Sequence, residues 1–175
     1  MTIDEAVIAV FAEDMFEDLE LWYPLLRLQE AAAEVRVIGP KAGATYSGKR
    51  GLSVTSDSSI DAANPSDYNA LVIPGGYAPD RMRRHAAMIE FTRQMHAQNK
   101  LIAAICHAGW VPISAGIVQG KTVTSFWSIA DDLRNAGAEW VDRDVVRDGN
   151  LITSRYPDDL PAFCRSIIGA LTATR

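Results

Sequence analysis

The chain has 175 residues, 48% of them hydrophobic, and this length suits one domain with a sizeable core. The apolar share is too high for a disordered chain, and two cysteines are too few for a disulfide framework. Seventeen basic against 22 acidic residues give a net charge of −5, whereas a dedicated nucleic-acid binder usually carries a basic surplus. We therefore expect one acidic globular domain over residues 1–175.

The N-terminus and the length of the apolar runs bear on location. Asp4 and Glu5 are acidic where a secretory signal peptide would be basic. No apolar run approaches the roughly 20 residues that a helix needs to cross a bilayer. The sequence predicts a cytoplasmic protein that does not contact membranes.

The first half of the chain alternates short apolar runs with helical patterns. Residues 6–11 are expected to form a buried strand, because a Val- and Ile-rich run is flanked by acidic residues. A helix over residues 17–33 follows, and Pro24 inside it predicts a kink. The other elements expected up to residue 73 are a strand over 34–38, a hairpin over 44–55 and a buried strand over 70–73.

The second half continues the alternation. A helix is expected over residues 80–98, followed by a strand over 101–105 that leads into a short helix ending near residue 115. The remaining expected elements are β-like residues 122–124, a helix over 130–135, strands at 141, 145–146 and 151–153 with an Asp-Gly turn, and a closing helix over 157–171. Strands that alternate with helices predict an α/β fold, a mostly parallel sheet with helices on both faces.

Motifs for cofactors and metals are absent from the sequence. There is no G-x-G-x-x-G fingerprint for a dinucleotide. Residues 116–122 resemble a phosphate-binding loop, but they have one residue too few between the glycines and lead from helix into strand. His85, His96 and His107 share no metal-ligand spacing, and neither cysteine has a C-x-x-C partner. We expect no cofactor and no metal.

Cys106 follows an apolar strand where the chain turns abruptly into a helix. A thiol at a helix N-terminus is expected to favour the thiolate, which is the nucleophilic form. Gly75 and Gly76 end the neighbouring strand at the same sheet edge, where their backbone N–H groups could stabilise an oxyanion. The carboxylate-rich segment 13–20 ends at this edge too. From its position alone, Cys106 can be interpreted equally well as a catalytic thiol or as a small buried residue of the core.

Cys164 has a different environment. It lies beside Phe163 and Ile167 on the apolar face of the last expected helix. A core role is therefore expected for this second cysteine, and the two cysteines are not expected to pair.

Six segments in order resemble the DJ-1/PfpI superfamily, in particular its PfpI-like branch of intracellular cysteine peptidases and deglycases. The resemblance covers nearly the whole chain, and the matching segments are 16–20, 71–81, 104–107, 113–116, 131–142 and 148–155. Each segment alone is a weak signal, whereas their order and spacing together are specific.

The resemblance implies a flavodoxin-like, doubly wound fold of the class I glutamine amidotransferase type. It implies that Cys106 is the nucleophile, that Glu17 contacts the thiol and that His107 is the second catalytic residue. The backbone N–H groups of Gly76 and His107 would form the oxyanion hole. Asp80 would reach the histidine from a neighbouring subunit, so that a homodimer or hexamer is expected.

The chain departs from the family pattern at three positions. Ala108 follows the Cys-His pair where relatives have glycine, and its methyl group narrows the pocket floor or shifts the elbow. Asp80 stands where glutamate is common, and a shorter side chain puts a complete triad in doubt. Phe126 stands where tyrosine is common, so a pocket hydroxyl is missing.

Together these features predict a cysteine-dependent hydrolase that acts in a stress response. The resemblance implies a deglycase or glyoxalase for methylglyoxal- or glyoxal-derived adducts, with an intracellular cysteine peptidase as the alternative within the same class. An alternative of a different class is a redox sensor or chaperone in which Cys106 is oxidised rather than catalytic. A flavin carrier ranks last, because the acidic loop over residues 12–15 would repel a phosphate.

Overall fold

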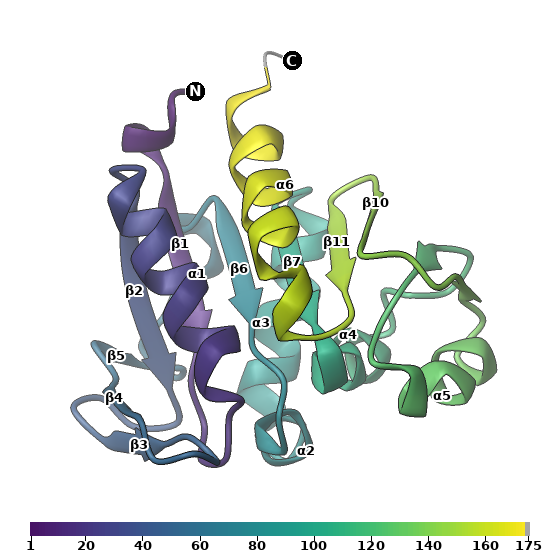
Figure 1. Cartoon of the computed structure of the whole chain (residues 1–175). Coiled ribbons are helices and arrows are strands. Elements are labelled where there is room, and N and C mark those ends of the chain that lie inside the picture. The colour runs from purple at the N-terminus through teal and green to yellow at the C-terminus, as the bar shows by residue number, and fades with distance from the viewer. Residues whose placement is uncertain (174–175) are drawn as a thin grey trace.

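The structure is a computed structural model that describes residues 1–173 (Figure 1). Its centre is a seven-stranded sheet in the order β10-β11-β7-β6-β1-β2-β5, parallel throughout except for β10, which is antiparallel to β11. The strands are β1 (Val7–Phe11), β2 (Glu34–Gly39), β5 (Ser58–Ser59), β6 (Ala70–Ile73), β7 (Leu101–Ile105), β10 (Val145–Asp148) and β11 (Leu151–Ser154). The predicted fold class is confirmed.

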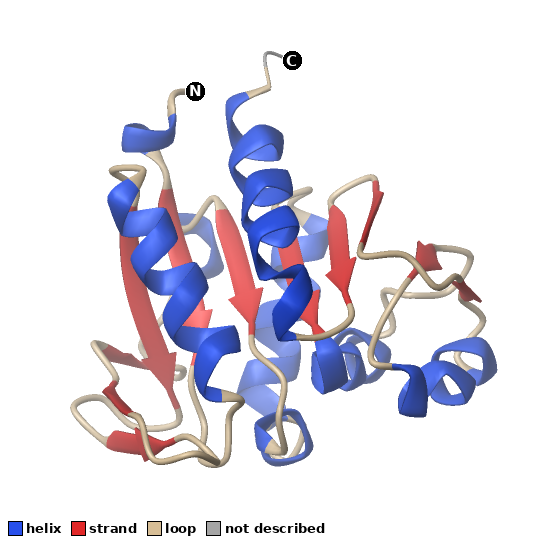
Figure 2. Cartoon of the chain, in the orientation of Figure 1, coloured by secondary structure: helices blue, strands red, loops and turns tan. Residues whose placement is uncertain are grey.

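Helices cover both faces of this sheet (Figure 2). On the face toward the viewer, α1 (Asp18–Glu30) packs against α6 (Leu160–Thr172). Behind the sheet, α3 (Ala86–Ala97) contacts α4 (Trp110–Ala115), which also contacts α2 (Ala78–Met82). The remaining helix, α5 (Ala130–Asn135), lies beyond β10. Pro24 lies inside α1, as the sequence indicates.

Two small sheets flank the central one. The strands β3 (Thr45–Ser47) and β4 (Ser53–Thr55) form the expected antiparallel hairpin. The strands β8 (Thr122–Val123) and β9 (Glu139–Trp140) form a parallel pair.

The core lies on both faces of the middle strands. All five residues of β7 are buried, as expected for a parallel strand covered on two sides. Phe11 at the end of β1 packs on Phe91 of α3, with ring centroids 5.6 Å apart. Cys164 on α6 is 1% exposed, so the prediction of a core role for this cysteine is confirmed. These contacts hold the carboxyl ends of β1, β6 and β7 at one edge of the sheet.

Some predicted elements differ from the structure. The helix expected over residues 80–98 is two helices, α2 and α3, because His85 takes an extended conformation before α3. Met82 at the end of α2 and Met88 in α3 are both fully buried. Val141 lies just beyond β9 rather than in a strand, and the two-residue strand β5 is an element that the sequence pattern did not predict.

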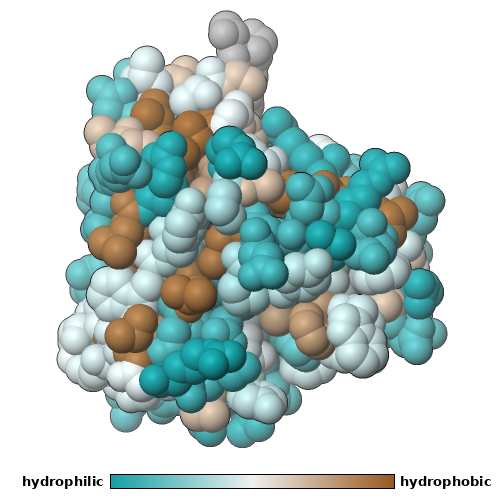
Figure 3. Space-filling model, in the orientation of Figure 1, coloured by the Kyte–Doolittle hydropathy of each residue, from teal (hydrophilic) through white to brown (hydrophobic). Residues whose placement is uncertain are grey.

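The surface is mixed in polarity. No helix within residues 1–173 is long and apolar enough to cross a membrane. Exposed apolar side chains on α1 are Leu19, Tyr23 and Leu26, and Figure 3 shows separate apolar patches among polar residues on the face that carries α1 and α6.

Candidate active site

Cys106 directly follows β7, at the start of a 3-10 turn (Cys106–Gly109) that leads into α4. Its φ angle is 62°, in the left-handed region that non-glycine residues rarely adopt. The residue is 8% exposed. A strained backbone conformation at a strand-to-helix elbow is typical of a residue whose side chain must be aimed at a site.

The loop after β6 lies against this elbow and requires glycine. Gly76 has a φ of 78°, and a Cβ atom there would lie 2.4 Å from the backbone nitrogen of Glu17. A Cβ on Gly75 would lie 2.5 Å from Oε2 of Glu20 and 2.7 Å from Cβ of Cys106. Phe16 forms an antiparallel bridge with Gly76. The two glycines thus allow the loop to lie between the first helix and the thiol.

Two backbone N–H groups face the sulfur of Cys106. They belong to Gly76 and His107, and both lower the pKa of the thiol by stabilising its charged form. The structure therefore brings together the two amides that the family resemblance assigns to an oxyanion hole. Donors that hold a thiolate are placed to hold an oxyanion that forms one bond away from the sulfur.

A carboxyl group that the sequence reasoning missed, that of Glu20, lies beside Cys106. Glu20 is fully buried in α1, and its Oε2 accepts a hydrogen bond from the Gly75 N–H at 2.9 Å. Its Oε1 has no hydrogen-bond partner among the residues described. Burial, followed by the nearby charge of Glu17, raises the pKa of Glu20 to about 8. The carboxyl group is therefore mainly protonated at neutral pH.

Helical spacing could have identified Glu20 from the sequence. Glu20, Pro24 and Leu28 are four residues apart on α1, and all three are buried. An acidic residue in such a buried row needs a partner or a function, because burying an unpaired charge is costly.

Burial raises the pKa of the Cys106 thiol, and the neighbouring Glu20 carboxylate raises it further. This direction is opposite to the one expected from a helix N-terminus alone. The helix that follows the elbow, α4, has only six residues, so its dipole is weak compared with the effect of burial. Formation of the thiolate at this position depends on a nearby group that can take up the proton of the thiol.

Glu17 lines the same cavity as Cys106 but pairs with two cations. Its Oε2 lies 3.0 Å from Nζ of Lys49, and its Oε1 lies 3.3 Å from Nε of Arg50. The carboxyl group that couples electrostatically to the thiol is that of Glu20. The structure thus places Glu17 at the cavity wall, with Lys49 and Arg50 as its described partners.

His107 is held on several sides. Its Nδ1 lies 3.2 Å from Sγ of Cys106, and its Nε2 lies 3.1 Å from Oγ of Ser128. The ring stacks on Phe126, with centroids 5.0 Å apart, and Trp110 packs against it edge to face. Burial, together with the charge of Lys49, lowers the pKa of His107, so the neutral ring can accept a proton. Ser128 was not identified from the sequence.

Asp80 lies in α2 and forms an ion pair with Arg84, one helical turn further along. The contacts described for Asp80 do not include His107 of the same chain. A reach of Asp80 to the histidine of a neighbouring subunit stays a prediction.

The site opens into a cavity of about 320 Å³. Its lining residues are Glu17, Glu20, Lys49, Arg50, Gly76, Tyr77, Cys106, His107, Phe126, Tyr156 and Pro157. Ala108, which follows the Cys-His pair, is fully buried. The cavity is large enough for a small organic substrate.

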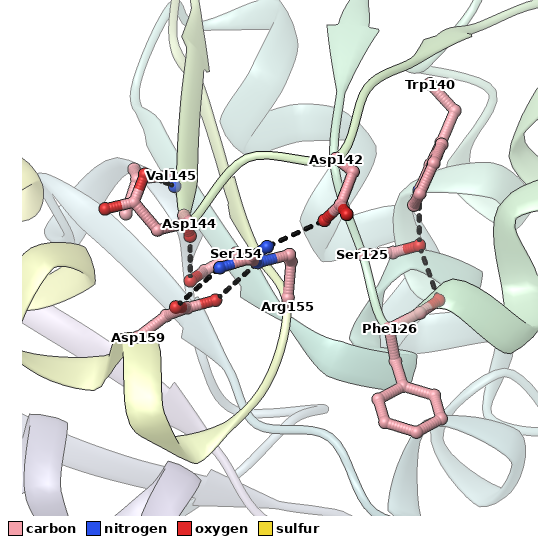
Figure 4. A network of polar contacts seen from close by, with 9 residues as sticks. All are labelled: Ser125, Phe126, Trp140, Asp142, Asp144, Val145, Ser154, Arg155 and Asp159. Carbon is pink, nitrogen blue, oxygen red and sulfur yellow. Dashed lines mark hydrogen bonds and ion pairs between the residues drawn. The ribbon is translucent and has the colours of Figure 1, made fainter.

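Separate groups of polar contacts lie next to the cavity-lining residues Phe126, Tyr156 and Pro157 (Figure 4). Trp140 donates its indole N–H to Oγ of Ser125 at 3.0 Å, and that hydroxyl donates to the carbonyl oxygen of Phe126. Arg155 binds Asp159 through two nitrogens, at 2.9 and 3.1 Å, and Asp142 at 2.7 Å. The contacts of Arg155 connect the chain before β10 with the start of α6, next to the lining residues Tyr156 and Pro157.

Replacing Arg155 by glutamine is expected to lower the free energy of unfolding by about 2 kcal/mol, measured by urea denaturation. The reason is that Asp159 is only 7% exposed and would lose its cationic partner. Arg27→Gln is the matched control, because Arg27 pairs with Glu30 at the surface, and it is expected to cost less than about 0.5 kcal/mol. Equal losses in the two variants would contradict this role for Arg155.

Comparisons with known proteins show which family the chain resembles over most of its length. The DJ-1/PfpI family model matches residues 6–170. The deglycase PfpI of Pyrococcus furiosus is 45% identical over 156 residues, which are 89% of this chain and 93% of the relative. Protein/nucleic acid deglycase 2 of Escherichia coli K12 is 44% identical over 168 residues, 95% of this chain and 98% of the relative.

The fold is shared with solved structures as well. Drosophila melanogaster DJ-1beta superposes with a TM-score of 0.90 at 30% identity, covering 99% of this chain and 92% of that one. The resemblance indicated by the sequence segments is thereby confirmed. The chain belongs to the DJ-1/PfpI family.

Proposed function

We propose that the protein is a cysteine-dependent deglycase, which hydrolyses adducts of methylglyoxal or glyoxal with amines. One observation carries the proposal. Cys106 is held in a left-handed conformation between the N–H groups of Gly76 and His107, beside the protonatable Glu20. The similarity to relatives that are named deglycases supports the same substrate class.

The first step is attack by sulfur. Sγ of Cys106 bonds to the aldehyde-derived carbon of the adduct, the bond from that carbon to nitrogen breaks, and the amine leaves with a proton. The thiol proton passes to Nδ1 of His107, which lies 3.2 Å from the sulfur, or to Glu20 in the fraction of molecules in which its carboxyl group is ionised. The same group then gives this proton to the leaving amine. The product of this step is a hemithioacetal on Cys106 and a free amine.

The remaining steps release the acid. A proton moves from the sulfur-bound carbon to the neighbouring carbonyl carbon through an enediolate, which converts the hemithioacetal into a thioester of the hydroxy acid. Water then cleaves the thioester, so that one water is consumed and one α-hydroxy carboxylate is formed. We expect the N–H groups of Gly76 and His107 to hold the oxyanions of both steps, and their hydrogen bonds to the Cys106 sulfur support this role.

The proposal includes the wider site and the assembly. Cys106 and His107 are the catalytic pair. Glu17 pairs with Lys49 and Arg50 and so positions these two cations at the cavity wall. Asp80 would reach His107 across an interface between subunits, in a homodimer or hexamer that works in the cytoplasm. Size-exclusion chromatography with light scattering tests the assembly.

Turnover of a defined adduct tests the function. The protein is incubated with the methylglyoxal adduct of Nα-acetyl-lysine, and free amine and lactate are measured. Equal amounts of the two products are expected. Cleavage of a peptide substrate without lactate release would favour the peptidase instead. Oxidation of Cys106 by peroxide with neither activity would favour a redox sensor.

A further inference from the structure

Two cations line the cavity on one side of Cys106. Lys49 and Arg50 belong to the turn between β3 and β4, and both contact Glu17. The Lys49 side chain is 30% exposed, and the Arg50 side chain is 72% exposed. Nζ of Lys49 also lies 5.4 Å from the centre of the Tyr77 ring. Lys49 is thus fixed in the wall, while the guanidinium of Arg50 faces solvent at the cavity.

The turn that carries these cations is held in place by backbone contacts. The carboxylate of Asp18 accepts hydrogen bonds from the N–H groups of Arg50 at 2.9 Å and Leu52 at 2.8 Å. The N–H of Lys49 donates to the carbonyl oxygen of Phe16 at 2.9 Å. Asp18 is 2% exposed, so this clamp is shielded from water. The backbone that carries the two cations is therefore fixed before a ligand binds, and binding has to order only the side chains.

The charges at this wall do not balance. Glu17 supplies one negative charge against the two positive charges of Lys49 and Arg50. Glu20, with its pKa raised to about 8 by burial, is mainly neutral at pH 7. Among the charged residues that line the cavity, one positive charge therefore remains, in a chain whose net charge is −5. The carboxylate of Asp18 holds the N–H groups of the turn from outside this lining. The excess is local, and it suits one monoanion inside the cavity.

We infer that the cavity selects substrates that carry a carboxylate group, with Arg50 as the residue that binds this carboxylate and Lys49 as its support. The planar guanidinium offers paired N–H donors that match the two oxygens of a carboxylate. A single residual positive charge favours a carboxylate over a phosphate dianion. The inference rests on the proposed function, because it places the substrate in the cavity of Cys106.

Alkylation of Cys106 by a charged and a neutral reagent tests the inference without requiring turnover. Iodoacetate and iodoacetamide differ in the carboxylate alone, and their rates at Cys106 are followed by mass spectrometry of the intact protein at low salt. Each rate is divided by the rate of the same reagent with 2-mercaptoethanol at the same pH. The iodoacetate-to-iodoacetamide ratio is expected to be about three- to tenfold above one.

Arg50→Gln is expected to bring this ratio down to about one. Arg147→Gln removes the same charge at the hairpin end of β10, at the sheet edge opposite to Cys106, and is the matched control that keeps the wild-type ratio. A ratio at or below one in the wild type, or one that Arg50→Gln does not change, would overturn the inference.

A second measurement separates this inference from the proposed function. KM is compared for methylglyoxal adducts of Nα-acetyl-lysine and of its uncharged amide, and the carboxylate form is expected to have the lower KM. Arg50→Gln is expected to remove the difference. Selective alkylation without turnover of either adduct would refute the deglycase alone. Turnover of both adducts with equal KM, together with unselective alkylation, would refute the carboxylate site alone.

Discussion

Replacing Cys106 by serine is expected to lower the turnover of methylglyoxal adducts by at least about a thousandfold. A hydroxyl group at this buried position is far harder to ionise than a thiol. The neighbouring Glu20 and His107 are too weakly basic to take the proton of an alcohol. Serine adds no bulk at the 8%-exposed site, so the fold and the elbow remain. Lactate release at saturating adduct measures the effect.

Cys164→Ala is the matched control for this substitution. Cys164 is the other cysteine of the chain, and it packs in the core on α6 rather than at the cavity. Its replacement is expected to change stability but to leave turnover within about twofold of the wild type. If Cys106→Ser retained more than a few per cent of the activity, Cys106 would not be the nucleophile.

Replacing Glu20 by glutamine is expected to slow alkylation of Cys106 by iodoacetamide about a hundredfold at pH 8. The buried thiol and carboxyl group titrate as a coupled pair, and a carboxylate can accept the thiol proton whereas an amide cannot. In the wild type the rate is expected to rise with pH through about 8, where the pair loses its first proton. In the variant this rise moves to higher pH.

Glu17→Gln is the matched comparison, since both glutamates line the cavity. Glu17 pairs with Lys49 and Arg50, so its replacement is expected to slow the reaction less than about tenfold. A larger loss in Glu17→Gln than in Glu20→Gln would instead identify Glu17 as the group that accepts the proton, as the family resemblance implies.

The free energy of unfolding is also expected to depend on pH because of Glu20. The pKa of Glu20 is about 8 in the folded protein against an ordinary value of 4.5, so folding favours the protonated carboxyl group. The resulting stabilisation of the folded protein is complete below pH 4.5 and is lost as the pH rises to about 8. The free energy of unfolding falls by about 4–5 kcal/mol over this range. Urea unfolding at several pH values should show the loss in the wild type. It should be absent from the stability curve of Glu20→Gln and should appear in the difference between the two proteins.

The arrangement of the sheet could be predicted from the sequence because it depends on local patterns. The apolar runs at β1, β6 and β7 are short and continuous, which is typical of buried parallel strands. The break between α2 and α3 escaped prediction because the apolar pattern continues through it, whereas His85 is extended in the folded chain. Periodicity along one helix does not report such a tertiary preference.

The site shows the same division between local and tertiary information. Cys106 and Gly76 follow strands whose ends meet at one edge of the sheet, so topology alone brings them together. The choice between Glu17 and Glu20 depends on the rotation of α1 about its axis. Ser128 reaches His107 from a 3-10 turn (Trp127–Ile129) that lies 21 residues further along the chain. Neither relation is visible in the neighbouring sequence. The spacing of Glu20, Pro24 and Leu28 is the local signal that comes nearest to identifying Glu20 as a site residue.

The left-handed backbone at Cys106 also restricts how this enzyme can change over evolution. Side chains that branch at the β-carbon are strongly disfavoured at a positive φ, so threonine is not an accessible replacement although its hydroxyl serves as a nucleophile in other proteins. Unbranched cysteine and serine are the nucleophiles that the elbow can accommodate. Descendants of this chain that lose the thiol can therefore keep the backbone only with a small unbranched residue, and their chemistry must come from neighbouring groups.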